Sequence, residues 1–128
     1  MKKKVINTSN APSAIGPYNQ SIKINDMLFI SGQIPLIADT MKLVSGSIEE
    51  ETHQVMKNLG FILEKAKMQF RDVVKSTIYL DDMENFSTVN EVYGSYFDKG
   101  DEPSRETVAV KSLPKNVRIE ISMIAVNQ

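Results

Sequence analysis

The sequence has no cysteine and only one histidine, His53, and these shortages exclude several kinds of chemistry. Without cysteine there is no disulfide, no thiolate nucleophile and no thiolate metal site. One histidine cannot form a zinc-binding cluster within a chain, and the chain offers no Ser–His or Cys–His nucleophile pair. We therefore expect no metal site and no cofactor, and we interpret His53 as a solvated side chain.

Glycine-rich loops, long apolar runs and an excess of charge of one sign are also missing. Gly16, Gly32 and Gly46 are isolated, and no Gly-x-Gly-x-x-Gly phosphate loop occurs. No segment approaches the length needed to cross a membrane, and polar residues follow the basic N-terminus where a signal peptide would be apolar. The formal net charge of −1 gives nucleic acid little to bind. We expect a cytoplasmic, soluble protein with no membrane or nucleic-acid partner.

The 128 residues fit a single domain, residues 1–128, that is long enough to bury a core. A Ser-x-x-Glu capping box from Ser47 to Glu50 starts a helix, and Asp81-Asp82 offers an N-cap for a second helix. The expected elements are, in order, hairpin strands at 21–24 and 27–31, a helix from 47, a strand at 73–80, a helix from 82 closed by Gly100, and strands at 105–110 and 117–123. This order predicts an α+β fold with two layers, in which two helices pack on one face of a mixed β-sheet.

The last two strands carry the residues that matter most for function. Both alternate polar and apolar residues, and Leu113-Pro114 separates them, so we expect them to pair as an antiparallel hairpin. The register that aligns their apolar rows puts Arg105 and Thr107 on the same sheet face as Glu120. On pattern alone, a surface Arg–Glu ion pair is the simpler interpretation. The alternative is a small anion held by the guanidinium, with a carboxylate across from it.

The polar face of the sheet also bears on assembly. We place Arg105, Thr107, Arg118, Glu120 and Ser122 on it, which is too polar for a second dry core. Such a face suits contact with other subunits around wet pockets, so oligomerisation is expected. The chemistry that remains available is acid–base catalysis by a carboxylate, with an arginine that selects carboxylate substrates.

Several stretches along nearly the whole chain resemble the RidA (reactive intermediate deaminase, YjgF-type) family. The matching stretches are residues 14–18 (Ala-Ile-Gly-Pro-Tyr), 30–36 (Ile-Ser-Gly-Gln-Ile-Pro-Leu), 73–75 (Val-Val-Lys), 89–93 (Val-Asn-Glu-Val-Tyr), Pro103 with Arg105, and 113–121. The resemblance implies a chorismate-mutase-like fold and a homotrimer with ligand clefts between subunits. It also implies cofactor-free hydrolysis of 2-imino acids, such as 2-iminobutanoate and 2-iminopropanoate, to 2-oxo acids and ammonia.

The resemblance assigns roles to particular residues. Arg105 would grip the substrate carboxylate, and Glu120 would position the attacking water. The other substrate-binding residues would be Tyr18, Ser31, Gly32, Asn90 and Thr107.

The sequence departs from the family pattern at several positions, among them Lys67, where glycine often ends the helix. Thr107 stands where active deaminases usually have cysteine, and Glu106 adds a charge beside the key arginine. By strand parity Glu106 points away from the Arg105 face, so we expect little direct neutralisation. Glu51 replaces a frequent glutamine, and we interpret this difference as peripheral.

Two other functions remain open at this stage. A non-catalytic regulator would bind 2-oxo acids in the same cleft without turnover. An endoribonuclease or translation inhibitor, a role also attached to the family, has little support from a chain of net charge −1.

Overall fold

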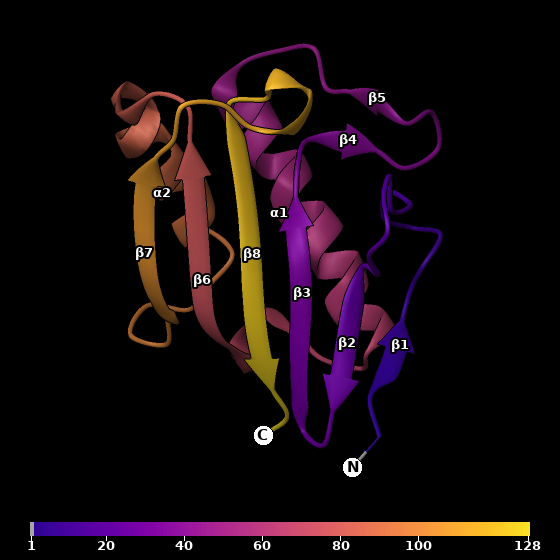
Figure 1. The fold of residues 1–128 in the computed structure, drawn as a ribbon. Coiled ribbons are helices and arrows are strands. Elements are labelled where there is room, and N and C mark those ends of the chain that lie inside the picture. Colours follow the sequence, from indigo (N-terminus) through magenta and orange to yellow (C-terminus); the bar gives the residue numbers. More distant parts are fainter. Residues whose placement is uncertain (1) are drawn as a thin grey trace.

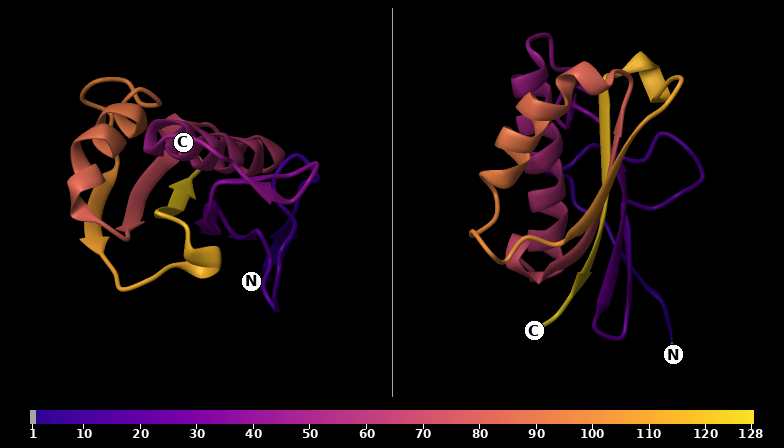
Figure 2. Two further views of the ribbon diagram at one scale, coloured as in Figure 1. Left: turned by 90° about the horizontal axis from the view of Figure 1, so that it is seen from above. Right: turned by 90° about the vertical axis from the view of Figure 1, so that its left-hand side faces the viewer.

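The computed structural model describes residues 2–128 and has the expected two layers (Figure 1). A six-stranded sheet has the strand order β1-β2-β3-β8-β6-β7, and only the β6–β7 pair is parallel. Both helices lie on one face of this sheet (Figure 2), which confirms the predicted α+β class. The elements are β1 (Lys4–Ile6), β2 (Ser21–Ile24), β3 (Met27–Gln33), β4 (Leu36–Ile37), β5 (Lys42–Leu43), α1 (Ile48–Lys65), η1 (Phe70–Asp72), β6 (Val73–Leu80), η2 (Met83–Asn85), α2 (Phe86–Gly94), β7 (Ser104–Ala109), η3 (Pro114–Asn116) and β8 (Ile119–Val126).

The first helix starts where its capping residue predicts. The hydroxyl of Ser47 accepts a hydrogen bond from the Glu50 backbone N–H at 3.2 Å, which satisfies one of the free donors of the first turn. Val55, Leu59 and Ile62 recur at helical spacing and are fully buried against the sheet. The helix therefore covers the central strands and supplies much of the core.

The second helix is shorter than predicted. It ends at Gly94, and Gly100, with φ of +91°, lies in the following loop. Tyr96 and Phe97 therefore pack against the core from a loop after the helix. Their apolar spacing continued the helical stripe in the sequence, which is why the sequence placed the helix end too late.

The predicted hairpin between the last two strands is wrong. β6 lies between β7 and β8, pairing with β7 in parallel and with β8 antiparallel. The reason is topological: α2 crosses from the end of β6 back to the start of β7, and a β-α-β crossover pairs its strands in parallel. β8 then fills the gap between β3 and β6 (Figure 1), and β7 becomes an edge strand.

The sheet face away from the helices is uncovered in a single chain and is partly apolar. Met27 and Phe29 on β3 and Val108 on β7 are 38%, 40% and 41% exposed. Exposed apolar groups on one face of a sheet are typical of a surface that contacts another protein. This face differs from the predicted polar face, because Arg105 and Thr107 are not on it.

Candidate functional site

Arg105 lies on the helix face of the sheet. Its register partner on β6 is Ser76, which in turn is opposite Met123 on β8, and both of these residues are buried beneath the helices. The guanidinium carbon of Arg105 lies 5.7 Å from the ring centroid of Phe86 and 5.2 Å from that of Tyr93. Both rings come from α2, so the helix and the edge strand hold the arginine between them.

Two more predicted residues accompany Arg105. Thr107 is two positions along β7 on the same face, and its hydroxyl oxygen is buried without a hydrogen-bond partner. Asn90 is half-buried on α2, four residues after Phe86 and three before Tyr93, so it shares their face of the helix. We call Phe86, Asn90, Tyr93, Arg105 and Thr107 the arginine half-site.

Glu120 lies on the opposite, uncovered face. Its register partner on β6 is Tyr79, which is paired on its other side with Val108 of β7. Three other predicted residues surround Glu120, and we call these four residues the glutamate half-site. The glutamate half-site consists of Tyr18, Ser31, Gly32 and Glu120. Together with Ile15, Ile34 and Pro114, these residues line a cavity of about 430 Å³.

Gly32 is required for the position of the Glu120 carboxylate. A Cβ atom added to Gly32 would lie 2.8 Å from Cδ and 3.0 Å from Cγ of Glu120, closer than carbon atoms approach without a clash. Near this position the pairing of β3 with β8 is irregular, between Ile30 and Gln33. The backbone of β3 thus approaches the glutamate side chain closely because residue 32 has no side chain.

Burial also changes the acidity of Glu120. Desolvation raises the pKa of its carboxyl group above the ordinary value of 4.5, because the charged form loses hydration. A raised pKa brings a carboxyl group closer to the range in which it can both accept and return a proton near neutral pH.

The predicted arrangement of Arg105 and Glu120 on one face is therefore wrong for a single chain. The expectation assumed that β7 and β8 were neighbours. Because β6 lies between them, the register no longer puts the side chains of Arg105 and Glu120 on the same face. The seven predicted site residues fall into two groups on opposite faces of the sheet. Arg105 and Glu120 form no ion pair within residues 2–128 of one chain, and Arg105 does not line the cavity at Glu120.

Glu106 behaves as strand parity predicts. Its side chain lies on the face opposite Arg105, where it pairs with Lys75 at 3.0 Å and accepts a hydrogen bond from Thr77 at 2.9 Å. The hydrogen bond from Lys75 is the largest cause that lowers the pKa of Glu106, followed by that from Thr77. The added negative charge is thus held away from the guanidinium of Arg105.

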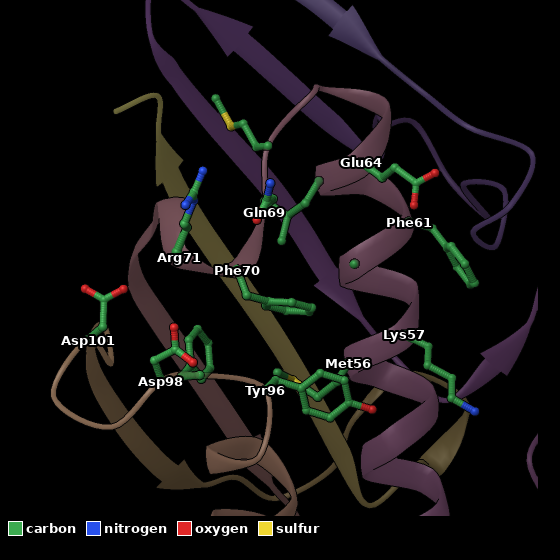
Figure 3. A pocket seen from close by; sticks show the side chains of 14 residues that line it. Met56, Lys57, Phe61, Glu64, Gln69, Phe70, Arg71, Tyr96, Asp98 and Asp101 are labelled. Atoms are coloured by element: carbon green, nitrogen blue, oxygen red, sulfur yellow. The ribbon is translucent and has the colours of Figure 1, made fainter.

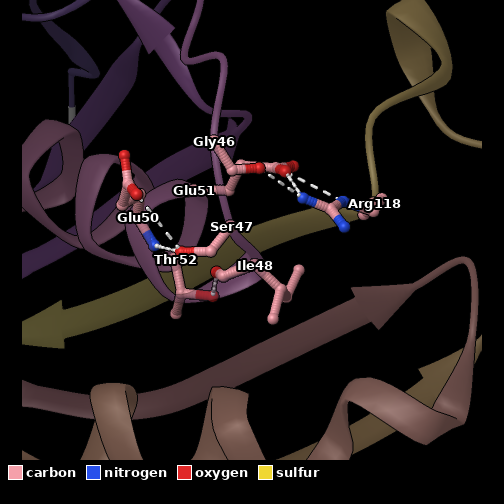
Figure 4. Close-up of polar contacts among 7 residues, drawn as sticks. All are labelled: Gly46, Ser47, Ile48, Glu50, Glu51, Thr52 and Arg118. Carbon is pink, nitrogen blue, oxygen red and sulfur yellow. Dashed lines mark hydrogen bonds and ion pairs between the residues drawn. The ribbon is translucent and has the colours of Figure 1, made fainter.

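Glu51 is not peripheral, contrary to the sequence-based interpretation. It is only 7% exposed in the first turn of α1, and it forms an ion pair with Arg118, which precedes β8 (Figure 4). Arg118 also donates a hydrogen bond to the carbonyl oxygen of Gly46 at 2.9 Å. This pair joins the start of α1 to the strand that carries Glu120, so its role is structural.

Replacing Glu51 with alanine should lower the free energy of unfolding by about 1–3 kcal/mol, since it leaves the Arg118 guanidinium without its partner. Urea unfolding at one fixed protein concentration would measure the change. Glu49 is an exposed acid in the same helical turn, and Glu49→Ala should cost no more than about 0.5 kcal/mol. Equal losses in the two variants would contradict a structural role for the Glu51–Arg118 pair.

His53 is not simply solvated. Its Nδ1 atom lies 2.8 Å from the hydroxyl oxygen of Tyr96, which connects α1 to the loop after α2. Tyr96 also lines the largest cavity, of about 620 Å³, between α1, η1 and that loop (Figure 3). This cavity contains none of the seven predicted site residues, so size alone does not identify the site here.

No group of three or more His, Cys, Asp or Glu side chains within residues 2–128 is arranged to hold a metal ion. None of the helices in the same range has the length and apolar character needed to cross a membrane.

Comparisons with known proteins agree on one family. The family profile described as "Endoribonuclease L-PSP" matches residues 8–127. The chain is 48% identical over 125 residues to chloroplastic Reactive Intermediate Deaminase A of Arabidopsis thaliana, covering 98% of this chain but 66% of that longer protein. It is 47% identical to the Mus musculus 2-iminobutanoate/2-iminopropanoate deaminase, covering 97% of this chain and 91% of that protein.

A solved structure shows the same fold. A crystal structure from Thermotoga maritima superimposes with a TM-score of 0.95 at 48% identity, covering 100% of this chain and 99% of that one. Because one relative is chloroplastic by name, the cytoplasmic location stays a prediction. The profile match, the identities and the fold together show that the chain belongs to the RidA family, also described as the endoribonuclease L-PSP family.

Proposed function

We propose that the protein is a 2-imino acid deaminase whose active site forms between two copies of the chain in a homotrimer. One subunit would supply the arginine half-site and its neighbour the glutamate half-site. The observation that carries the proposal is the separation of Arg105 and Glu120 on opposite sheet faces, because a small substrate cannot reach both in one chain. The apolar groups exposed on the uncovered face provide a surface on which a second copy can pack.

The chemistry of the two half-sites fits this reaction. Within residues 2–128 no carboxylate pairs with Arg105, so its guanidinium is free to bind a substrate carboxylate through two parallel hydrogen bonds. Glu120 is half-buried with a raised pKa, as suits a group that accepts a proton from water and later returns it. The relatives named as deaminases support the substrate class: 2-iminobutanoate and 2-iminopropanoate.

The proposed reaction needs only positioning and proton transfer. Arg105 holds the substrate carboxylate, and Glu120 takes a proton from a water molecule as the water oxygen bonds to the imine carbon. The C=N π electrons move to the nitrogen, which gives a tetrahedral carbinolamine. Glu120 then passes the proton to the nitrogen, and the C–N bond breaks as the C=O bond of the 2-oxo acid forms. The carbinolamine O–H proton returns to the Glu120 carboxylate, which passes it to the departing ammonia, so ammonium leaves and Glu120 is ionised again. A protonated imine is a reactive electrophile, so orienting water beside it accounts for much of the required acceleration.

One assay tests the proposal against a non-catalytic binder. A threonine dehydratase generates 2-iminobutanoate in situ, and its decay is followed with and without the protein. We expect the protein to accelerate the decay in proportion to its concentration. Binding of 2-oxobutanoate with no acceleration would instead support the non-catalytic regulator.

The pH profile should report the acidity of Glu120. Glu120 must be ionised to accept a proton, and its pKa is raised. As the pH is lowered, kcat/KM should therefore begin to fall while the pH is still above 4.5, the ordinary pKa of glutamate. Stopped-flow decay of the imine over a pH series would measure this limb. In Glu120→Gln the residual activity should lack the limb. The same limb in wild type and variant would assign the titration to another group.

Ionisation of Glu120 should raise activity but lower the stability of the fold. A raised pKa in the folded state means that Glu120 destabilises the fold once it ionises, so its cost appears as pH rises through and above about 4.5. Glu120→Gln should therefore be more stable than wild type at pH 7, and this difference should shrink on acidification.

A further inference from the structure

Two half-buried arginines, Arg105 on β7 and Arg118 just before β8, are held in different ways. Arg118 donates through Nε and one terminal nitrogen to the Glu51 carboxylate, and it donates again to a backbone carbonyl oxygen. The side chain of Arg105 makes no ion pair or hydrogen bond among residues 2–128, and its guanidinium carbon lies 5.7 Å and 5.2 Å from the ring centroids of Phe86 and Tyr93. The difference matters because a carboxylate occupies the N–H donors of a guanidinium, whereas an aromatic ring attracts its charge without occupying them.

The Tyr93 ring is itself firmly placed. Its hydroxyl donates to the Ser76 hydroxyl oxygen at 2.8 Å, and Ser76 is the residue opposite Arg105 on the neighbouring strand. The Tyr93 side chain is 4% exposed, and its ring centroid lies 4.9 Å from that of Phe97. Burial is the main cause that raises the pKa of Tyr93, so its hydroxyl stays neutral at physiological pH.

Phe86 holds the other side of this arrangement. It begins α2, and Tyr93 follows seven residues later, so two turns of one helix present both rings on the same face. Phe86 is half-buried and packs against the main core. The packing of α2 against the core therefore sets the positions of both rings.

We propose that Phe86 and Tyr93 are positioning residues, which fix the Arg105 guanidinium by cation–π attraction and leave its N–H donors free for a monocarboxylate. The ligand class is a small 2-oxo or 2-imino acid. The inference deepens the proposed function, but carboxylate binding tests it without any turnover.

The sharpest test weakens the attraction without changing the shape of the ring. Fluorine atoms on an aromatic ring withdraw electron density from its face, so phenylalanine with one, two and three ring fluorines is incorporated at position 86. Isothermal titration of the full-length protein with 2-oxobutanoate then gives Kd. We expect Kd to rise with each fluorine, by about 2- to 5-fold across the series, which corresponds to the loss of a surface cation–π contact. KM should rise in parallel, with kcat changed less.

Controls separate this role from simple packing. The same fluorinated residues at Phe61, a 37% exposed ring in the largest cavity, should leave Kd unchanged. Phe86→Leu should weaken binding about 3- to 30-fold, whereas Phe86→Tyr keeps an aromatic ring and should bind as tightly as the wild type. Circular dichroism melts and the oligomer mass confirm that each variant folds and assembles.

The outcomes are distinguishable from those of the proposed function. If the protein shows no deaminase turnover but Kd still follows the fluorine series, the deaminase proposal fails and the positioning inference stands. A Kd that is flat across the series, or no 2-oxobutanoate binding by the wild type, overturns the positioning inference.

Discussion

Replacing Arg105 with alanine should reduce kcat/KM for 2-iminobutanoate by about 100- to 1,000-fold, because the substrate loses its carboxylate anchor and its alignment with the attacking water. The fold should survive, since Arg105 is half-buried on an edge strand and no acidic group in residues 2–128 depends on it. Steady-state kinetics with in situ imine generation, beside a thermal melt, would measure both effects.

Two further variants show whether charge or geometry matters. Arg105→Lys keeps the positive charge but lacks the two-pronged donor geometry, so it should recover only part of the loss. Arg71→Ala removes an exposed arginine that lines the largest cavity, away from both half-sites, and should leave kcat/KM unchanged. Full activity of Arg105→Ala, or an equal loss in Arg71→Ala, would remove the basis for the proposed site.

The second large effect is expected from Gly32→Ala. The new methyl group would occupy the space of the Glu120 side chain, whose Cδ atom it would approach to 2.8 Å, so the carboxylate must move. We expect kcat to fall about 100-fold, as for a misplaced catalytic group. Gly32 is not among the residues with positive φ, and the displaced atoms belong to a flexible side chain, so the loss of stability should be small.

A comparison of variants links this effect to Glu120. Adding Gly32→Ala to Glu120→Gln should reduce the rate little further, because both changes act on one carboxylate. Gly94→Ala is a matched control, since an added Cβ at Gly94 meets nothing within 4 Å. If the effects of Gly32→Ala and Glu120→Gln multiply, Gly32 acts through something other than the glutamate.

The sequence predicted where the strands and helices lie in the chain better than it predicted which strands pair with each other. Alternating residues correctly indicated strands around Arg105 and Glu120, because a strand with one buried face has period 2 whatever strand it pairs with. The partner depends on the crossover through α2, which local alternation does not encode. The same error placed Arg105 and Glu120 on one face, although the site residues themselves were assigned through the family resemblance.

The roles of several other residues could not be predicted from the sequence, because these roles depend on tertiary contacts. Phe86 and Tyr93 formed part of an apolar helical stripe, and nothing in that spacing separates a core ring from one that contacts an arginine. The difference at Glu51 was interpreted as peripheral and His53 as solvated, yet their partners Arg118 and Tyr96 lie 67 and 43 residues away in the chain. The two-turn spacing of Phe86, Asn90 and Tyr93 was the one usable signal, since it gathers an amide and two rings on a single helix face.

Mixed oligomers give the most direct test of the central claim that two subunits complete each site. Arg105→Ala and Glu120→Gln subunits, each with little activity alone, are combined in equal amounts by refolding together or by co-expression. Random assembly should place an intact arginine half-site against an intact glutamate half-site in about a quarter of the clefts, restoring about a quarter of wild-type activity. Activity no higher than that of the separate variants, in oligomers shown by mass to contain both chains, would contradict the shared site.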